Sequence, residues 1–343
     1  MGVTKRSPVR GVAALAMLLV AAVAGCSSKS DDTASQAKTP DKVVYITGFG
    51  SFGRDAYIWV AKQKGYFKAA NIDVQIEPGN GSNNERELAA GKAQFSAIDL
   101  SAAILQISKA PSPLGIRAIA AIQQNSMSAI MALPGSGIAR PQDLAGKTIA
   151  VTPGGVEELL FPNYAKLAGF DGSKVKFVSS SAAQLPQMLA TSQVNAISQF
   201  VVGQPTVQAV VKSKSLTVLP YSDYIKDLYG NALFTTTSLI KSNPDLVKRF
   251  RDALLKGLND SLADPDGAGK ILQQNVPTAN ATSAAAELSL MKQYVQGTAG
   301  ATVGGLTPDR VGQMVDTLHD AGAIQKTVDA DTIVDFDLVP KQG

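Results

Sequence analysis

Residues 43–65 read VVYITGFGSFGRDAYIWVAKQKG, and this stretch carries the pattern that decides the fold. Residues 43–46 are β-branched or aromatic, which favours a short buried strand. A glycine-rich turn follows, and residues 55–64 have helical spacing that ends at Gly65. A strand, a turn and a helix in this order predict one unit of an α/β sheet.

The same alternation continues through the first third of the chain. The pattern predicts further strands at residues 73–77, 95–98 and 116–122, and helices at 83–90 and 102–109. Strands that are joined by helices favour a mostly parallel sheet covered by helices on both faces.

A second set of strands and helices starts near residue 148. It comprises strands at 148–151, 175–178, 195–198 and 216–219 and helices at 156–167, 182–190 and 205–211. From residue 244 onward the chain is predicted to be helical and to pack back on the first set, with helices at 246–262, 283–296 and 309–321.

Two α/β sets in succession predict an α/β protein with two lobes. The apolar segments 126–133 and 232–239 are interpreted as two extended crossings between the lobes. The predicted boundaries are therefore 41–130 and 232–343 for lobe one and 131–231 for lobe two. Two lobes on a pair of crossings form a hinge that a ligand can close, as in periplasmic-type binding proteins.

The first 25 residues have the features of an export signal. Three basic residues within the first ten precede an apolar run at 11–24, and small residues precede Cys26. The run is shorter than the roughly 20 apolar residues that a membrane span needs.

Cys26 is the only cysteine of the chain, and the residues before it resemble a bacterial lipobox. This resemblance implies cleavage before Cys26, lipidation of its thiol and a position on the extracytoplasmic face of the membrane. The alternative is an ordinary signal peptide that contains a cysteine by chance. Residues 26–40 are polar, and we expect them to form a flexible tether.

The composition excludes several classes of function. Without residues 1–25 the chain has 29 basic and 28 acidic residues, so no basic surface for nucleic acid is expected. One cysteine permits no internal disulfide, and His319 as the only histidine makes a transition-metal site unexpected. We expect no cofactor and a monomeric protein.

Several motifs follow one another in a fixed order along the mature chain. They are Gly65-Tyr66-Phe67, Asn71-Ile72-Asp73-Val74, Ala90-Gly91-Lys92-Ala93-Gln94-Phe95, Asp143-Leu144-Ala145-Gly146-Lys147 and Asn243-Pro244-Asp245-Leu246. In this order the chain resembles the solute-binding proteins of ABC importers for sulfonates, nitrate and thiamine pyrimidine precursors.

The resemblance covers nearly all of the mature chain. It implies a type II periplasmic-binding fold, a cleft between the lobes, and delivery of a small molecule to a permease and its ATPase. The chain departs from the family at Gln94 and Asn195, where many members carry an acid. Phe49 and Phe52 occupy a loop that often holds Trp and His in pyrimidine-binding members.

The loop at 48–53 is the first candidate binding element. It reads G-x-G-x-x-G between a strand and a helix, which also fits a dinucleotide fingerprint, although such a motif alone is weak evidence. We favour a different use, in which Gly50 lets the backbone approach a ligand and Phe49 and Phe52 form a hydrophobic wall. A plain flexible turn is the alternative.

Arg54 begins the following helix. Its guanidinium could hold a sulfonate or a carboxylate through two parallel hydrogen bonds. The alternative is a solvated side chain at a helix start.

Most of the remaining candidates follow the ends of predicted strands, where open α/β sheets bind ligands, and Asn231 precedes the second crossing. Helix caps or surface positions are the alternatives for most of them. They are Gly81, Ser82, Asp99, Thr152, Gly154, Gly155, Gln199 and Asn231. Free N–H groups at Gly154 and Gly155 are expected to face lobe one.

Catalysis is not expected. No G-x-S-x-G motif is present, and His319 has no obvious partner serine. A pyrimidine-precursor synthase of the same fold would need histidine and a cysteine cluster. The interpretation is a binding protein for an aromatic heterocycle or a sulfonate-type anion, and a ligand-sensing lipoprotein is the alternative.

Overall fold

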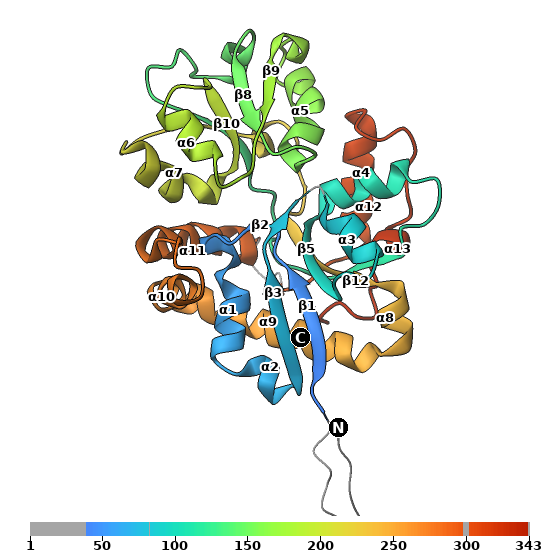
Figure 1. Cartoon of the computed structure of the whole chain (residues 1–343). Coiled ribbons are helices and arrows are strands. Elements are labelled where there is room, and N and C mark those ends of the chain that lie inside the picture. Colours follow the sequence, from blue (N-terminus) through green and yellow to red (C-terminus); the bar gives the residue numbers. More distant parts are fainter. Residues whose placement is uncertain (1–38, 82, 298–301, 342–343) are drawn as a thin grey trace, which may run out of the picture. The chain divides into compact units, whose positions relative to one another are not determined.

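Two five-stranded sheets form the framework of the protein (Figure 1). The structure is a computed structural model that describes residues 39–81, 83–297 and 302–341. The first sheet has the order β3 (Ile72–Glu77), β1 (Asp41–Ile46), β5 (Phe95–Asp99), β12 (Asn231–Thr236) and β6 (Ile116–Ala121). The second has the order β11 (Thr217–Pro220), β7 (Ser128–Ala132), β10 (Ala196–Phe200), β8 (Thr148–Val151) and β9 (Lys176–Ser179).

Each sheet contains one strand of reversed direction. β12 is antiparallel to both of its neighbours in the first sheet, and β7 is antiparallel to both of its neighbours in the second. The other pairs, β1 with β3 and β5 and β8 with β9 and β10, are parallel. The reversed strand is in each case the first strand that the chain forms after it arrives from the other sheet.

The predicted strands and helices are confirmed to within a few residues, but the crossings between the sheets are not where we expected them. The chain crosses at residues 122–127 and again at 221–230, whereas the segments predicted to be crossings contain β7 and β12. An apolar extended run fits a buried central strand as well as a link, so the pattern could not separate the two. The predicted boundary between residues 130 and 131 therefore falls inside β7.

We refer to the first sheet and its helices (39–121 and 231–341) as lobe one and to residues 128–220 as lobe two. That the two lobes move relative to each other as independent domains stays a prediction. The helices of lobe two are α5 (Val156–Leu167), α6 (Leu185–Ala190) and α7 (Gln204–Val211). Those of lobe one are α1 (Ala56–Gln63), α2 (Tyr66–Ala69), α3 (Asn84–Ala89), α4 (Leu100–Lys109), α8 (Thr237–Ser242), α9 (Pro244–Ala263), α10 (Pro265–Asn275), α11 (Ala281–Gln296), α12 (Pro308–Asp320) and α13 (Ala330–Ile333).

Short elements complete the loops near the sheet ends. The two-residue strands β2 (Phe49–Gly50) and β4 (Gly79–Asn80) pair with each other. The 3₁₀ turns are η1 (Gly53–Asp55), η2 (Pro141–Leu144), η3 (Gly172–Lys174), η4 (Val201–Gly203) and η5 (Tyr221–Asp223). The glycine loop that the sequence singles out is thus a strand pair followed by a 3₁₀ turn.

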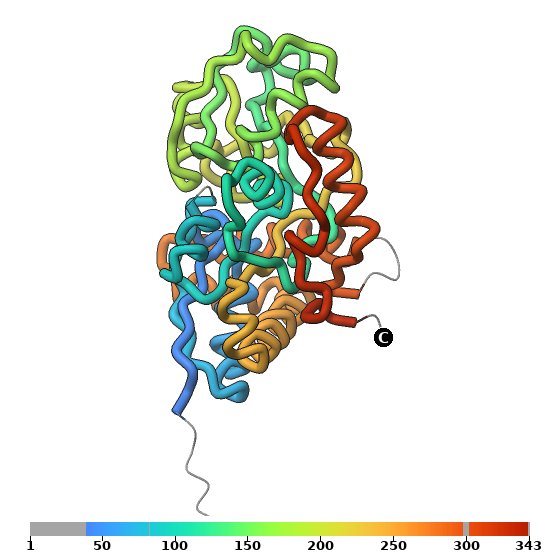
Figure 2. The backbone as a smooth tube through the Cα atoms, turned by 90° about the vertical axis from the view of Figure 1, so that its right-hand side faces the viewer, coloured from blue at the N-terminus to red at the C-terminus, as the bar shows by residue number. Residues whose placement is uncertain are grey.

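The C-terminal helices pack on lobe one, as predicted, and also reach lobe two (Figure 2). Helix α11 contacts α7 and η4, and Glu287 on α11 accepts a hydrogen bond from Thr206 on α7. Asn163 on α5 donates a hydrogen bond of 2.6 Å to the carbonyl oxygen of Ala321, directly after α12. The lobes are therefore held together by polar contacts as well as by the crossings.

Phe250 on α9 anchors the core of lobe one. Its ring stacks on Phe95 of β5 with a centroid distance of 3.9 Å and an interplanar angle of 3°, and Tyr45 and Phe67 lie beside it. Helix α9 also passes close to α1 at Gly257. A methyl group at this position would overlap the backbone oxygen of Tyr57, so only glycine permits this distance between the helices. Dispersion contacts of this density fix the sheet to its helices.

We predict opposite effects for two Gly→Ala substitutions in helices. Gly312→Ala on α12 meets no atom within 4 Å and should stabilise the protein by about 1 kcal/mol through helix propensity. Gly257→Ala should destabilise it by about 1–3 kcal/mol, because α1 must move to make room. Urea unfolding of both variants measures the change in the free energy of unfolding. If the two substitutions change it equally, the close packing of α1 on α9 is contradicted.

Candidate functional site

Two small cavities lie between the lobes, at the carboxyl ends of strands from both sheets. The first is lined from lobe one by Gly48, Phe49, Gly81, Asn84, Glu85, Ala97, Ile98, Asp99, Ala102 and Asn231 and from lobe two by Gly154, Gly155 and Val156. The second is lined by Phe49, Arg54, Thr152, Glu157, Ala182, Leu185, Ser198, Gln199 and Phe200. Phe49 lines both, so the two cavities are parts of one inter-lobe site.

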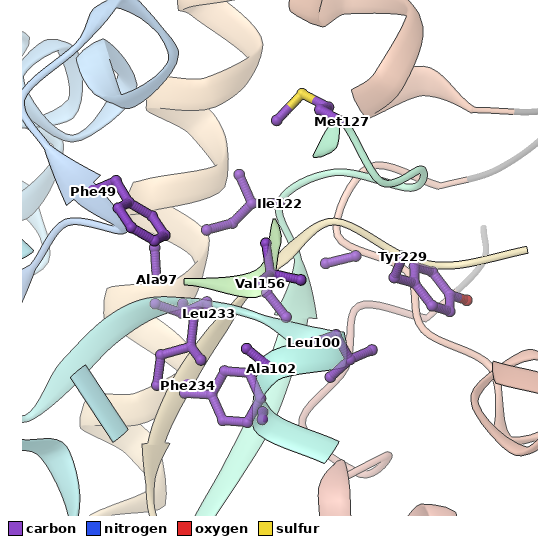
Figure 3. Packing of buried hydrophobic residues seen from close by; sticks show 14 of the residues in the cluster. Phe49, Ala97, Leu100, Ala102, Ile122, Met127, Val156, Tyr229, Leu233 and Phe234 are labelled. Carbon is purple, nitrogen blue, oxygen red and sulfur yellow. The ribbon is translucent and has the colours of Figure 1, made fainter. Parts of the chain in front are cut away.

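The site is closed in this structure. The cavity volumes are about 10 Å³ and 20 Å³, and each is close to the space that one water molecule needs. An organic ligand does not fit unless the lobes separate. The crossings that would permit such a movement are themselves packed, since Ile122, Met127 and Tyr229 are buried there (Figure 3).

Phe49 occupies the centre of the site. Its ring lies edge-on to Phe200 of lobe two, with a centroid distance of 5.9 Å and an angle of 83°. A methyl group at Gly81 would overlap this ring, and one at Gly155 would lie 3.2 Å from its tip. The two glycines therefore make room for an aromatic side chain that contacts both lobes.

Arg54 is buried beside this ring, so the alternative of a solvated side chain is wrong. Its guanidinium lies over the rings of Phe52 and Phe200, at 4.5 and 5.0 Å from their centroids. Asp55 and Glu287 lie 4.0 Å from its nitrogens. Its Nη1 has no hydrogen-bond partner among the described residues.

Asp99 ends β5 and caps α4. Its carboxylate accepts hydrogen bonds from the backbone N–H groups of Ser101 and Ala102, at 2.9 and 3.1 Å. Burial raises the pKa of Asp99 to about 6, although these bonds oppose the shift. Asp99 is thus the helix cap that the sequence allowed, and it also lines the first cavity.

Two further acids at the site escaped the sequence analysis. Glu85 lies in the first turn of α3 and Glu157 in the first turn of α5, and both are buried. Burial raises the pKa of each to about 7, and the negative charge of Asp99 adds to both shifts. The Oε2 of Glu85 has no hydrogen-bond partner among the described residues. The sequence held one signal for both residues. Each acid stands in the first helical turn after a loop that follows a strand, and such loops are where α/β sheets bind ligands.

The N–H groups that were expected to be free are occupied. The Gly154 N–H donates to Glu158 at 2.5 Å, and the Gly155 N–H donates to the carbonyl oxygen of Thr152 at 2.9 Å. At η1 the Phe52 N–H donates to Asp55, and the Arg54 N–H donates to Glu287 at 3.1 Å. The expectation of free N–H groups at Gly154 and Gly155 is therefore wrong.

The remaining candidates divide between the cavities and other places. Thr152 and Gln199 line the second cavity and Asn231 the first, while the amide oxygen of Gln199 accepts from the Phe200 N–H at 2.9 Å. Gly50 and Phe52 line a separate, larger groove at the surface instead. Phe49 and Phe52 thus do not form one wall. Ser82 and Cys26 lie outside the described residues.

The described residues contain neither a membrane-spanning helix nor a cluster of metal-binding side chains. In residues 39–81, 83–297 and 302–341 no helix has the length and apolarity needed to span a membrane. The same ranges hold no group of three His, Cys, Asp or Glu side chains that could bind a metal ion.

The buried acids predict a pH dependence of stability. The pKa values of Glu85, Asp99 and Glu157 are raised to about 7, 6 and 7 on folding, so the folded state favours their neutral forms. This contribution to stability is complete below the unfolded carboxyl pKa of about 4 and is lost as the pH rises through about 7. We expect the melting temperature to fall between about pH 4 and pH 7.

Glu157→Gln should flatten this slope, because it removes one of the shifted groups. Glu87→Gln, on the outer face of α3 with 37% of its side chain exposed, is the control and should keep it. Differential scanning calorimetry across the pH range measures the slope. A wild-type slope in the Glu157 variant would refute the assignment.

Comparisons with known proteins agree with this architecture. The riboflavin-binding protein RibY of Chloroflexus aurantiacus is 25% identical over 297 residues, which cover 83% of this chain and 82% of RibY. The alkanesulfonate-binding protein SsuA of Xanthomonas axonopodis pv. citri, bound to MOPS, superposes with a TM-score of 0.67 at 15% identity, covering 87% and 99% of the two chains. The desulfurization enzyme DszB superposes with a TM-score of 0.57 at 13% identity, covering 87% and 97%.

The structural likenesses show the fold, which is the type II periplasmic-binding fold with two α/β lobes. A family model described as NMT1/THI5 like matches residues 55–268, more than half of the sequence. The matched segment runs from η1 through all of lobe two to the start of α10. The chain belongs to the NMT1/THI5 like family.

Proposed function

We propose that this protein is the extracytoplasmic solute-binding component of an ABC importer. In this proposal it captures a small organic molecule between its lobes and delivers it to a permease. The observation that carries the proposal is the inter-lobe site, where an aromatic ring and buried polar side chains converge from both sheets. Open α/β sheets bind ligands at the carboxyl ends of their strands, and this site lies there.

Ligand entry requires the lobes to part. Opening breaks the contact between Phe49 and Phe200, the hydrogen bond between Thr206 and Glu287 and the hydrogen bond from Asn163 to Ala321. These contacts add to the packing of α11 on α7 and η4 and of Arg54 on the ring of Phe200. In this proposal opening is a hinge motion about the two crossings. A ligand that contacts both lobes then stabilises the closed form, which docks on the permease.

An aromatic heterocycle is the favoured ligand class, ahead of a sulfonate-type anion. Phe49 and Phe200 offer ring faces and edges in the site, and aromatic pairs favour offset or edge-to-face geometry. RibY, whose printed name states riboflavin binding, supports a ring compound. SsuA, whose printed name states alkanesulfonate binding, supports the sulfonate alternative less strongly, because it shares the fold with this chain but only 15% sequence identity.

The enzyme alternative has weaker support. DszB demonstrates that this fold is compatible with catalysis. His319, however, is exposed on α12, its Nδ1 lies 3.5 Å from a carboxyl oxygen of Asp320, and it lines neither cavity. A sensing lipoprotein with the same ligand remains the alternative to transport, and uptake of labelled ligand by cells that lack the gene separates these two.

The proposal predicts binding of a ring compound that closes the lobes. Residues 27–343 should gain thermal stability with riboflavin, pyrimidines or related rings, and small-angle X-ray scattering should show a smaller radius of gyration on binding. Phe49→Ala should weaken the best ligand by about threefold to tenfold, the typical worth of an aromatic pair.

Phe52→Ala is the matched control, because Phe52 lies in the same loop but outside both cavities. Its effect on affinity should be smaller. Preference for alkanesulfonates or nitrate would overturn the ring proposal. If no compound changes the thermal stability or the radius of gyration, this result counts against solute binding itself.

We also propose that Cys26 carries the lipid anchor and that residues 26–40 tether the lobes to the membrane. Inhibition of lipoprotein signal peptidase by globomycin should leave an uncut precursor, and Cys26→Ser should release the protein from the membrane fraction. Normal processing under the drug would contradict lipidation.

A further inference from the structure

Carboxyl groups of the protein already accept hydrogen bonds from several N–H groups around the inter-lobe site. Asp99 caps α4, Glu158 accepts from the Gly154 N–H at α5, and Asp55 and Glu287 accept from N–H groups at η1. Helix N-termini attract anions through such N–H groups. An anionic ligand would have to displace a built-in carboxylate at each of these places.

Arg54 does not restore a positive site. Asp55 and Glu287 lie 4.0 Å from its guanidinium nitrogens, and the rings of Phe52 and Phe200 cover it. The unpartnered Nη1 of Arg54 can donate to an acceptor on the ligand, such as a carbonyl oxygen. Burial raises the pKa of Asp55 to about 7 and also raises the pKa of Glu287, while the charge of Arg54 opposes both shifts.

Among the described residues, the site offers one unpartnered carboxyl oxygen in addition to the unpartnered Nη1 donor of Arg54. Glu85, Asp99 and Glu157 are the acids among the described residues that line the two cavities, and Arg54 is the basic residue there. Glu85 is 4% exposed, and its Oε2 has no partner among these residues. A buried carboxylate oxygen without a donor is costly, so this atom indicates a donor that the ligand supplies.

The acids come from both lobes. Glu85 and Asp99 belong to lobe one, on α3 and at the end of β5, and Glu157 belongs to α5 of lobe two. The charge of Asp99 raises the pKa of Glu85 and of Glu157, while Arg86 and Arg54 oppose these shifts. Closure therefore brings like charges together unless a cation or protons lie between them.

We propose that the site selects a ligand that carries a positively charged nitrogen group of the ammonium or amidinium class, held by Glu85, Asp99 and Glu157. This inference rests on the proposed solute-binding function and names the chemistry of its ligand. Glu85 and Asp99 line the first cavity and Glu157 the second, and the two cavities meet at Phe49, so in this proposal lobe closure brings Glu157 toward the nitrogen group that Glu85 and Asp99 hold. A sulfonate would instead add a negative charge to three buried acids.

Four probes with one ring and different charge test the inference. They are benzamidine, benzylamine, neutral benzamide and benzenesulfonate, titrated into residues 27–343 at pH 7.5 by isothermal calorimetry. The two cations should bind and benzenesulfonate should not. Glu85→Gln and Glu157→Gln should each weaken cation binding by about tenfold or more, the typical effect of losing a charge-assisted hydrogen bond.

Glu87→Gln, on the same helix as Glu85 but outside the cavities, is the matched control and should leave the affinity unchanged. Melting curves establish that each variant is folded, and the two site variants probe the inference from different lobes. Binding of benzenesulfonate, or full cation affinity in both site variants, would overturn the inference but not solute binding. The same holds if only a neutral ring from the wider panel binds. If no compound of either panel binds, solute binding and the inference fail together.

Discussion

The double crossing of the chain between its two sheets is the constraint on which the site depends. Each crossing leads into one strand of reversed direction, β7 in the second sheet and β12 in the first. This strand lies between two strands that run in the opposite direction to it. The loops after β1, β5 and β8 consequently meet at one junction, together with residues at the end of β10. Residues that are far apart in sequence, such as Phe49 and Phe200, come into contact there.

Electrostatics at this junction differ from what the glycine loops alone would lead one to expect. Glycine turns before helices offer N–H groups to anions in many proteins. Here nearby carboxylates accept from several of these groups, and a further buried acid keeps an unused oxygen. The chemical character of the site is therefore set by side chains in the first turns of helices and not by the loop backbone.

The relatives indicate which properties the framework carries and which it does not. Proteins whose names state riboflavin binding, alkanesulfonate binding and desulfurization share sequence or fold with this chain. A common framework with different ligands implies that specificity resides in a small number of exchangeable side chains. In the functions proposed above, those positions include Phe49, Glu85 and Glu157, none of which lies in a strand of the two five-stranded sheets.

The sequence by itself determined most of the strands and helices and the two-lobed α/β architecture, and it left Asp99 open between a helix cap and a ligand contact. Periodicity and turn residues are local, so they could be interpreted without the tertiary structure. The crossings were misplaced because an apolar extended segment such as β7 does not reveal whether it pairs on both sides. Glu85 and Glu157 were missed because acids are common in first helical turns, where the helix dipole favours them. Only the tertiary structure decided that these acids are buried and converge from two lobes, since burial depends on which surfaces face each other after the chain has crossed twice.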